Sequence, residues 1–232
     1  GSEALGANTT ASNSTAIGVS SLAANTTGDA NTAVGKDSLD SNTTGARNTA
    51  LGVDALQANT TTHDNVAIGY EALTLNTAAN NTAVGKGSLA ANTTAHSGVA
   101  VGVDALTANT TGTENTAVGI QALDTNTTGT GNVAIGTSVL DANTTADYNT
   151  AVGASALGAN TTGGTNTAVG ASALTANTTA EHNTAVGQNS LAANTTGHSN
   201  VALGRAALTS NTTANYNICL LYTSPSPRDR TR

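Results

Sequence analysis

Residues Asn31 to Arg47 read N-T-A-V-G-K-D-S-L-D-S-N-T-T-G-A-R, and the same pattern starts again seventeen residues later at Asn48. The consensus is N-T/V-A-V/I/L-G-x-x-A/S-L-x-x-N-T-T-G/A-x-x, and only the unit 65–80 is one residue short. Units begin at Ser14, Asn31, Asn48, Asn65, Asn81, Gly98, Asn115, Asn132, Asn149, Asn166, Asn183, Asn200 and Asn217. A fixed short period indicates an architecture in which each unit packs mainly against its neighbours.

Each unit predicts one coil of an all-β parallel β-solenoid, or β-roll. Positions one to five alternate, with Thr, Val, Ile or Leu at two and four, which is typical of a short strand. Gly at position five is expected to end that strand and permit a turn. The A/S-L pair predicts a second short strand, and N-T-T-G/A predicts a turn with left-handed backbone. Coils stacked about 4.8 Å apart pair their backbone groups, so thirteen coils span roughly 60 Å.

A helical solenoid is the competing interpretation, and the repeat argues against it. Helix-pair repeats usually need about 30 residues or more per unit. Gly at position five and its β-branched neighbours also disfavour a helix.

The core of such a coil is thin. Each unit offers for burial only one Leu, one Val or Ile and some Ala, against the entropy of ordering seventeen residues. Two remedies remain open: chains can share a core, as in a homotrimer, or identical Asn and Thr side chains can form hydrogen-bonded ladders along the axis. The small Ala at position three suits close approach of a neighbouring strand or chain.

Composition excludes several function classes. The chain has 232 residues with no Phe, Trp or Met, and its formal net charge is −7. A basic nucleic-acid footprint is absent, and no apolar run approaches membrane-spanning length. No nucleophile elbow, phosphate-binding loop, zinc-protease motif or dinucleotide fingerprint occurs. We therefore expect no enzyme, no catalytic, cofactor-binding or metal-binding residues, and no cofactor.

The core of the repeat carries a resemblance. The stretch N-V-A-I-G-T-S from Asn132 to Ser138 resembles the head repeats of trimeric autotransporter adhesins, which have an S-V-A-I-G-like core in a slightly shorter unit. Similar N-T-A-V-G-x-x-A-L repeats also look like those of phage and virus tail-fibre proteins. The resemblance covers residues 1–218 and implies a left-handed parallel β-roll in which three chains associate. The added L-x-x-N-T-T segment departs from the adhesin pattern.

The pattern stops after Ile218. Residues 1–218 form a continuous repeat array that begins and ends within a repeat, as expected for a fragment. Residues 219–232 resemble the conceptual translation of a transposase-type sequencing adapter, and we interpret them as non-native. They contain the single cysteine, Cys219, which therefore carries no information about redox compartment.

The N-T-T triplet is also an N-linked glycosylation sequon. The candidate residues are Asn8, Asn25, Asn42, Asn59, Asn92, Asn109, Asn126, Asn143, Asn160, Asn177, Asn194 and Asn211. Asn76 loses the sequon, whereas Asn13 and Asn80 form further ones. The alternative is an inward or edge Asn/Thr ladder, and the repeat itself multiplies any triplet.

Other residues suggest weaker alternatives. His182 and His198 fall on successive coils, where a zinc contact is conceivable but a solvated turn is the simpler interpretation. Asp37, Asp54, Glu71 and Asp104 share position seven and predict a solvated acidic stripe rather than a calcium site. A regular Thr array could face ice or a polysaccharide, although adjacent Thr residues of an extended N-T-T segment point to opposite sides.

These observations favour a non-enzymatic shaft of an extracellular fibre, filament or cell-surface adhesin. The alternative is a binding module that presents a regular solenoid face to glycan or ice. We expect self-association, as a homotrimer or an end-to-end filament, and no membrane insertion by this segment. Covalent glycans and a host or surface glycan are further partners that the pattern allows. The expected location is extracellular, at the cell surface or on a virion fibre.

Overall fold

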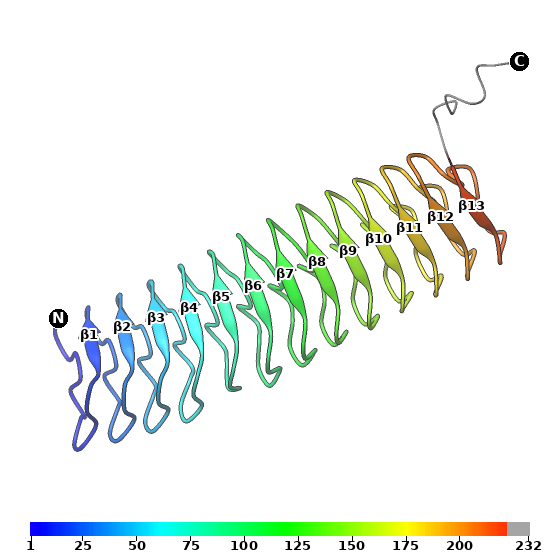
Figure 1. The fold of residues 1–232 in the computed structure, drawn as a ribbon. Helices are drawn as coiled ribbons and strands as arrows, with labels where there is room; N and C mark the ends of the chain where they lie inside the picture. The colour runs from blue at the N-terminus through cyan, green and yellow to red at the C-terminus, as the bar shows by residue number, and fades with distance from the viewer. Residues whose placement is uncertain (222–232) are drawn as a thin grey trace, which may run out of the picture.

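The computed structural model describes residues 1–221, in which thirteen short parallel strands form one sheet along the side of a rod (Figure 1). The strands are β1 (Thr15–Ile17), β2 (Thr32–Val34), β3 (Thr49–Leu51), β4 (Val66–Ile68), β5 (Thr82–Val84), β6 (Val99–Val101), β7 (Thr116–Val118), β8 (Val133–Ile135), β9 (Thr150–Val152), β10 (Thr167–Val169), β11 (Thr184–Val186), β12 (Val201–Leu203) and β13 (Ile218–Leu220). Their order in the sheet is their order in the sequence. The prediction of a parallel β-solenoid is confirmed.

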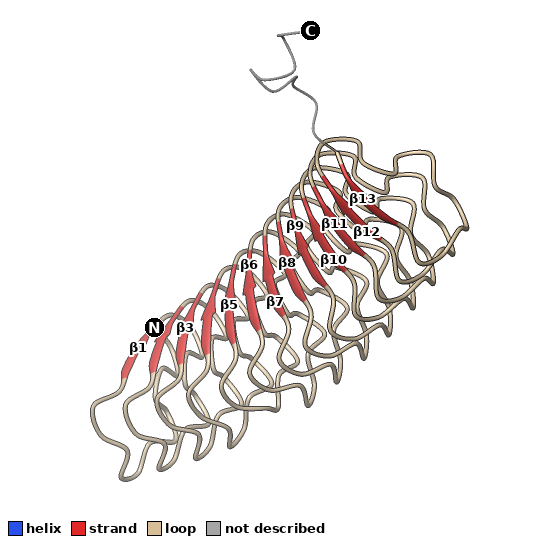
Figure 2. Cartoon of the chain, turned by 45° about the vertical axis from the view of Figure 1, so that its right-hand side comes forward, coloured by secondary structure: helices blue, strands red, loops and turns tan. Residues whose placement is uncertain are grey.

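Equivalent residues of successive coils stack on one another. Between β7 and β8, Ala117 pairs with Ala134 and Val118 with Ile135. The same register holds across the short unit 65–80, because its missing residue lies in the turn and not in the strand. Figure 2 shows the resulting arrangement, with the strands on one side of the rod and the turns forming the rest of each coil.

Glycine at position five follows each of the strands β1 to β12, as predicted, and Leu221 takes this place after β13. The φ angle of this residue lies between 121° in Gly153 and 145° in Gly52, a region that only glycine adopts readily. The site is also crowded, because a Cβ at Gly119 would collide with the carbonyl group of Gly136 in the next coil. Close stacking and backbone geometry therefore both require glycine here.

The second strand that we predicted at the A/S-L pair does not form. Positions seven, nine and seventeen instead take up positive φ, including the core residue Leu123 at 54°. Left-handed residues between right-handed ones turn the chain without making a strand. The stacking still holds, since the N–H of Leu123 donates to the carbonyl of Val139 at 3.0 Å. Our prediction of a left-handed residue within N-T-T-G/A is also wrong, because no residue at positions twelve to fifteen of the described coils has a positive φ.

The core is built from the Ala of position three, the Leu of position nine and the small residue before that Leu. Ala117 at position three and Leu123 at position nine have no exposed surface, and their equivalents in the other inner coils are buried in the same way. The aliphatic residue at position four was expected to be buried, and that expectation is wrong: Ile135 is 41% exposed. Because successive residues of a strand face opposite ways, burying Ala at position three turns positions two and four outward.

The boundary that we predicted at residue 218 stays a prediction. Cys219 occupies the place of the position-three Ala and pairs with Ala202 of β12, and the N–H of Leu221 donates to the carbonyl of Leu203. Backbone pairing of this kind does not depend on side-chain identity. The remainder of the segment 219–232, from residue 222 onward, lies outside the described residues.

Candidate functional site

A column of asparagine side chains runs through the rod at position twelve of the repeat. The Nδ2 of Asn126 donates to the Oδ1 of Asn109 at 2.9 Å and to the carbonyl of Gly129 at 3.0 Å. Its own Oδ1 accepts from the Nδ2 of Asn143 at 2.8 Å. Asn126 is fully buried. Both donors and the acceptor of the amide are thus satisfied inside the protein, which removes the cost of burying it.

Within residues 1–221 this column lacks two amide–amide links, one between Asn8 and Asn25 at the N-terminal end and one at the short unit. Asn92 donates to the Oδ1 of Asn76 at 2.6 Å. Among the described residues, however, no amide–amide bond joins Asn76 to Asn59 in the preceding coil. There the hydroxyl of Thr62, which stands where the consensus has Gly or Ala, donates to the Oδ1 of Asn59 instead. The irregular turn of one coil and the unusual residue of its neighbour therefore meet at the same point.

A second asparagine column lies at position one. The Oδ1 of Asn132 accepts from the backbone N–H of Asn149 at 2.9 Å, and its Nδ2 donates to the carbonyl of Ala146 at 2.8 Å. Gly98 interrupts this column, so the N–H of Asn115 lacks the side-chain acceptor that its equivalents have. Together the two columns confirm the predicted asparagine ladders and clamp both ends of the N-T-T turn.

The sequon residues are the position-twelve column itself. Ten of them are fully or almost fully buried: Asn25, Asn42, Asn59, Asn92, Asn109, Asn126, Asn143, Asn160, Asn177 and Asn194. Asn8 is exposed, Asn211 is half-buried, and Asn13 and Asn80 are exposed. An N-linked sugar is attached to Nδ2, the atom that donates in the column. The ladder alternative accounts for this geometry, and glycosylation stays a prediction. At the ten buried sites an attached sugar would displace the amide from the column.

The two threonines of N-T-T have different surroundings. The hydroxyl of Thr127, at position thirteen, donates to the carbonyl of Thr144 in the next coil at 3.0 Å. Thr128, at position fourteen, is exposed, as are its equivalents along the rod. The exposed row is Thr27, Thr44, Thr61, Thr94, Thr111, Thr128, Thr145, Thr162, Thr179, Thr196 and Thr213. Of the two threonine positions, therefore, only position fourteen forms a regular row of exposed side chains along the rod.

The outer sheet face, defined here by positions two and four of the strands, is a regular surface of exposed and half-buried side chains. In the complete units of residues 14–216 these two positions carry only Thr, Val, Ile or Leu. Large residues at position six, such as Ile120 and Val103, are also exposed. Exposed strips of apolar side chains are typical of interaction surfaces in general. The residue pattern indicated the strand but not that its larger side chains face outward.

Charged residues lie on the turns. Lys36 approaches the position-seven Asp37 at 2.6 Å, which raises the pKa of the lysine. At position ten of successive coils, Asp124 and Asp141 are half-buried. Burial raises the pKa of both carboxyls, and repulsion from Asp141 adds to the effect at Asp124. Within residues 1–221, the Oδ1 of Asp124 is the buried side-chain oxygen that lacks a hydrogen-bond partner.

The position-seven acidic residues and the histidines do not gather into a metal centre in the described part of the chain. No group of three or more His, Cys, Asp or Glu side chains there is close enough to hold an ion. His182 and His198 line one shallow hollow on the turns together with Glu181, but these side chains do not form a group that could hold an ion. Residues 1–221 also contain no helix of the length and apolarity needed to cross a bilayer.

Comparison of the chain with protein-family models, with curated proteins and with solved structures found no match.

Proposed function

We propose that this chain is a segment of the shaft of an extracellular fibre, filament or cell-surface adhesin, acting through length and rigidity rather than through catalysis. The observation that carries the proposal is the stacking of identical coils. Backbone bonds and buried asparagine columns link each coil to the next along almost the whole array. The residues that repeat most strictly are those that stack, whereas positions sixteen and seventeen vary freely. A shaft needs regularity only where coils meet.

The shaft is proposed to be a homotrimer whose chains share their outer sheet faces. In a single chain, Val and Ile side chains at position four remain partly exposed along the rod, which is unfavourable in water. A strip only three residues wide can line a common axis and bury these side chains together. The resemblance to trimeric adhesin repeats points the same way.

Sedimentation equilibrium of the full chain tests the trimer. The expected mass is three times the 22.5 kDa of one chain. The double variant Val118→Lys with Ile135→Lys is expected to sediment as a folded monomer, because two buried charges per chain would face each other at the axis. Thr128→Lys with Thr145→Lys, which adds the same charge to the exposed Thr row, is expected to stay trimeric. A wild-type chain that is a folded monomer at all concentrations contradicts the shared core.

Electron microscopy tests the shaft independently of the number of chains. Deleting residues 115–148, two whole coils, is expected to shorten the rod by about 9.6 Å and leave its width unchanged. A deletion that instead unfolds the whole chain, or leaves particles of unchanged length, contradicts the additive stacking on which the proposal rests.

A binding face is the second candidate function, favoured by the exposed Thr row at position fourteen. Its hydroxyls repeat at the coil spacing of about 4.8 Å, a regular array that ordered water or a polysaccharide could match. Inhibition of ice recrystallisation by the purified chain is the direct measurement. If the row binds ice, Thr128→Lys with Thr145→Lys abolishes inhibition, whereas the outer-face double variant leaves it intact.

A further inference from the structure

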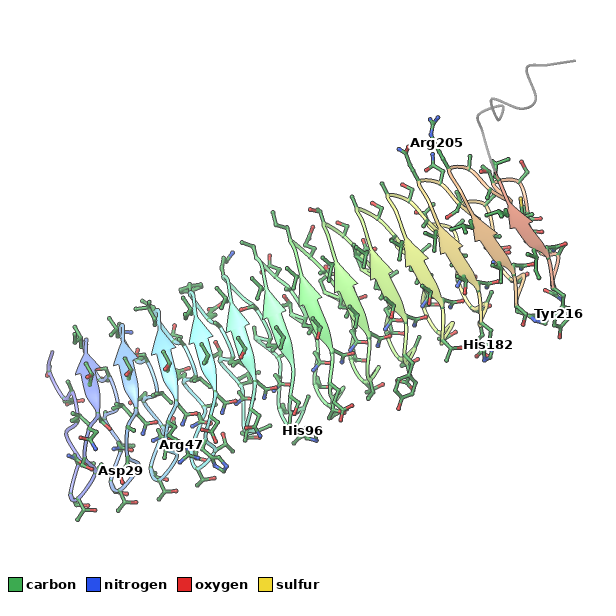
Figure 3. All side chains as sticks on the ribbon, viewed as in Figure 1. Asp29, Arg47, His96, His182, Arg205 and Tyr216 are labelled. Carbon is green, nitrogen blue, oxygen red and sulfur yellow. The ribbon has the colours of Figure 1, made fainter. Side chains whose placement is uncertain are left out.

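Position seventeen, the last of the repeat, lies on a left-handed turn at the surface of the rod. Its φ angle is positive in every described coil, between 56° and 68°, and its side chain is exposed or half-buried. Figure 3 shows Arg47, His182 and Tyr216, which occupy this position, along one edge of the rod, with Arg205 on the opposite edge. Asn is one of the few residues other than Gly that adopt this backbone routinely. Position seventeen therefore suits Asn without belonging to the core.

Two coils carry Asn at this position, at Asn13 and Asn80. Because positions one and two of the next unit follow, the chain reads Asn80-Asn81-Thr82 in one coil and N-S-T from Asn13 in the other. Both triplets are N-linked glycosylation sequons. Unlike the N-T-T sequon, they cross the boundary between two coils. Each one begins on the exposed turn and ends on the first residue of a strand, which is Thr82 of β5 in the second case.

The side-chain amide of Asn80 is free to carry a substituent. Asn80 is exposed, and its backbone N–H donates to the carbonyl of His63 at 3.3 Å. Within residues 1–221 its side chain has no hydrogen-bond partner. Asn126 differs in both respects, because it is fully buried and its Nδ2 donates two hydrogen bonds. A sugar on Nδ2 needs space and an N–H that is not in use. Asn80 has both, and Asn126 has neither.

The neighbours of Asn80 leave room for a sugar. Ala79, which precedes it, has a small side chain, and Ser97 occupies position seventeen of the next coil. The middle residue of the triplet, Asn81, belongs to the position-one column. It is 1% exposed, and its Nδ2 donates to the carbonyl of Ala95 at 2.9 Å. Of the two adjacent asparagines, only Asn80 is therefore accessible.

From this geometry we infer that Asn80 and Asn13 carry the N-linked glycans of this chain, in place of the ten buried asparagines at position twelve. The sugar donor is a glycosyl diphosphate. The Nδ2 of the asparagine bonds to C1 of the sugar, and the bond between C1 and the diphosphate oxygen breaks. The diphosphate leaves with the electron pair of that bond, and Nδ2 gives up one proton to a base of the transferase. The inference rests on the proposed extracellular location only for access to such a transferase.

Glycosylation of the folded chain in vitro tests the sites. The full chain, purified without sugars, is incubated with an oligosaccharyltransferase and a lipid-diphosphate oligosaccharide. Enzymatic release in heavy-oxygen water and mass spectrometry then identify each modified asparagine. Asn80 and Asn13 are expected to be modified, with occupancy at Asn80 at least about tenfold above that at the buried, fully bonded Asn126. Equal occupancy at Asn126 and Asn80 in the folded chain overturns the inference.

Two synthetic peptides control for local sequence. The peptide of residues 78–86 contains the Asn80 sequon, and the peptide of residues 122–131 contains the Asn126 sequon. Both are unfolded, so both are expected to accept the sugar, which would show that burial in the coil protects Asn126. The inference fails if the first peptide is not modified, or if it is modified while Asn80 of the folded chain is not.

Variants at position seventeen test the position itself. Ala30→Asn creates an N-N-T triplet in another coil and is expected to add one glycan, whereas Asn80→Gln is expected to lose one. Ala30→Asn should fold, because the same left-handed turn already holds Asn13 and Asn80. Ser199→Asn is the matched control, since it creates N-N-V without the hydroxyl that the sequon needs, and it should gain no sugar. An Ala30→Asn chain that gains no glycan while Asn80 carries one overturns the role of the position.

The sedimentation result separates this inference from the proposed function. A monomeric chain that accepts the sugar at Asn80 overturns the trimer and retains the glycan site. A trimer whose Asn80 is not modified does the reverse.

Discussion

The interior of the coil and the outer sheet face come from the same three-residue strand, yet they differ in the way they use side-chain size. Inside, Ala at position three packs against Leu, and asparagine amides complete the layer. Outside, the larger Val, Ile or Leu of position four is partly exposed. The thin coil has room only for the smaller residue. The difference teaches that the strand turns its larger aliphatic side chains outward, while the coil takes its large buried side chain, the Leu of position nine, from outside the strand.

The largest expected effect on stability comes from shortening a core side chain. Leu123→Ala removes a fully buried side chain and should reduce the free energy of unfolding by about 2–5 kcal/mol. Its outer counterpart, Val118→Ala, should cost less than about 1 kcal/mol in a single chain, because Val118 is only partly buried there. Urea denaturation of both variants measures the contrast. If the outer sheet face is shared between chains, the loss of stability caused by Val118→Ala grows with protein concentration. The loss caused by Leu123→Ala persists at every concentration.

Breaking the asparagine column at position twelve should have the next largest effect on stability. Asn126→Ala leaves the Oδ1 of Asn109, the Nδ2 of Asn143 and the carbonyl of Gly129 short of one partner each. Unpaired buried polar groups predict a loss of about 1–3 kcal/mol. Thr128→Ala, two residues away on the exposed row, should change stability by less than about 0.5 kcal/mol. Equal urea midpoints for the two variants would show that the column contributes little.

Restoring the missing asparagine of the column at position one should stabilise the rod. Gly98→Asn supplies the missing amide, whose Oδ1 can accept from the N–H of Asn115 as its equivalents do. The new Cβ lies 3.2 Å from the Oδ1 of Asn81 and 3.6 Å from Leu89, so a small shift accommodates it. The expected gain is about 1 kcal/mol, from one buried hydrogen bond and a stiffer unfolded chain. Gly98→Ala is the control that changes the backbone but adds no amide, and thermal unfolding should rank Asn above Ala.

The smallest expected effect is the pH dependence from Asp124 and Asp141. Burial raises the pKa of both carboxyls, so the folded chain holds these protons more tightly than the unfolded chain. Between the ordinary Asp pKa near 3.8 and the raised value, the unfolded state binds fewer protons, and stability falls as pH rises. Asp124→Asn should flatten this fall and stabilise the chain at neutral pH by less than about 1 kcal/mol, since both carboxyls are partly solvated.

Denaturation midpoints from pH 3 to 7 check this sign. Glu114→Gln, on an exposed turn, controls for the loss of one negative charge. A wild-type chain whose stability rises over this range, relative to Asp124→Asn, contradicts the assignment.

Much of the fold could be predicted from the repeat, because identical units impose identical neighbours. The strand at positions two to four, the glycine that ends it and the asparagine ladders all follow from residue types at fixed spacing. The side of the strand that faces inward could not be predicted in this way. Alternation defines two faces, and the choice between Ala and Val depends on how little space the rest of the coil encloses.

Other features depend on the closed shape of the coil. Leu123 sits at positive φ, which propensity disfavours for a bulky residue, because stacking on the next coil outweighs the local cost.

The break in the asparagine column at the short unit has a mechanical consequence. Under tension along the axis, all coils carry the same force. Separation therefore begins at the junction that has the fewest hydrogen bonds between successive coils. The junction between Asn59 and Asn76 lacks the amide link that its counterparts in the other inner coils have. A pulled rod should therefore yield there first, in a defined place, and divide into two shorter intact pieces before either piece unravels.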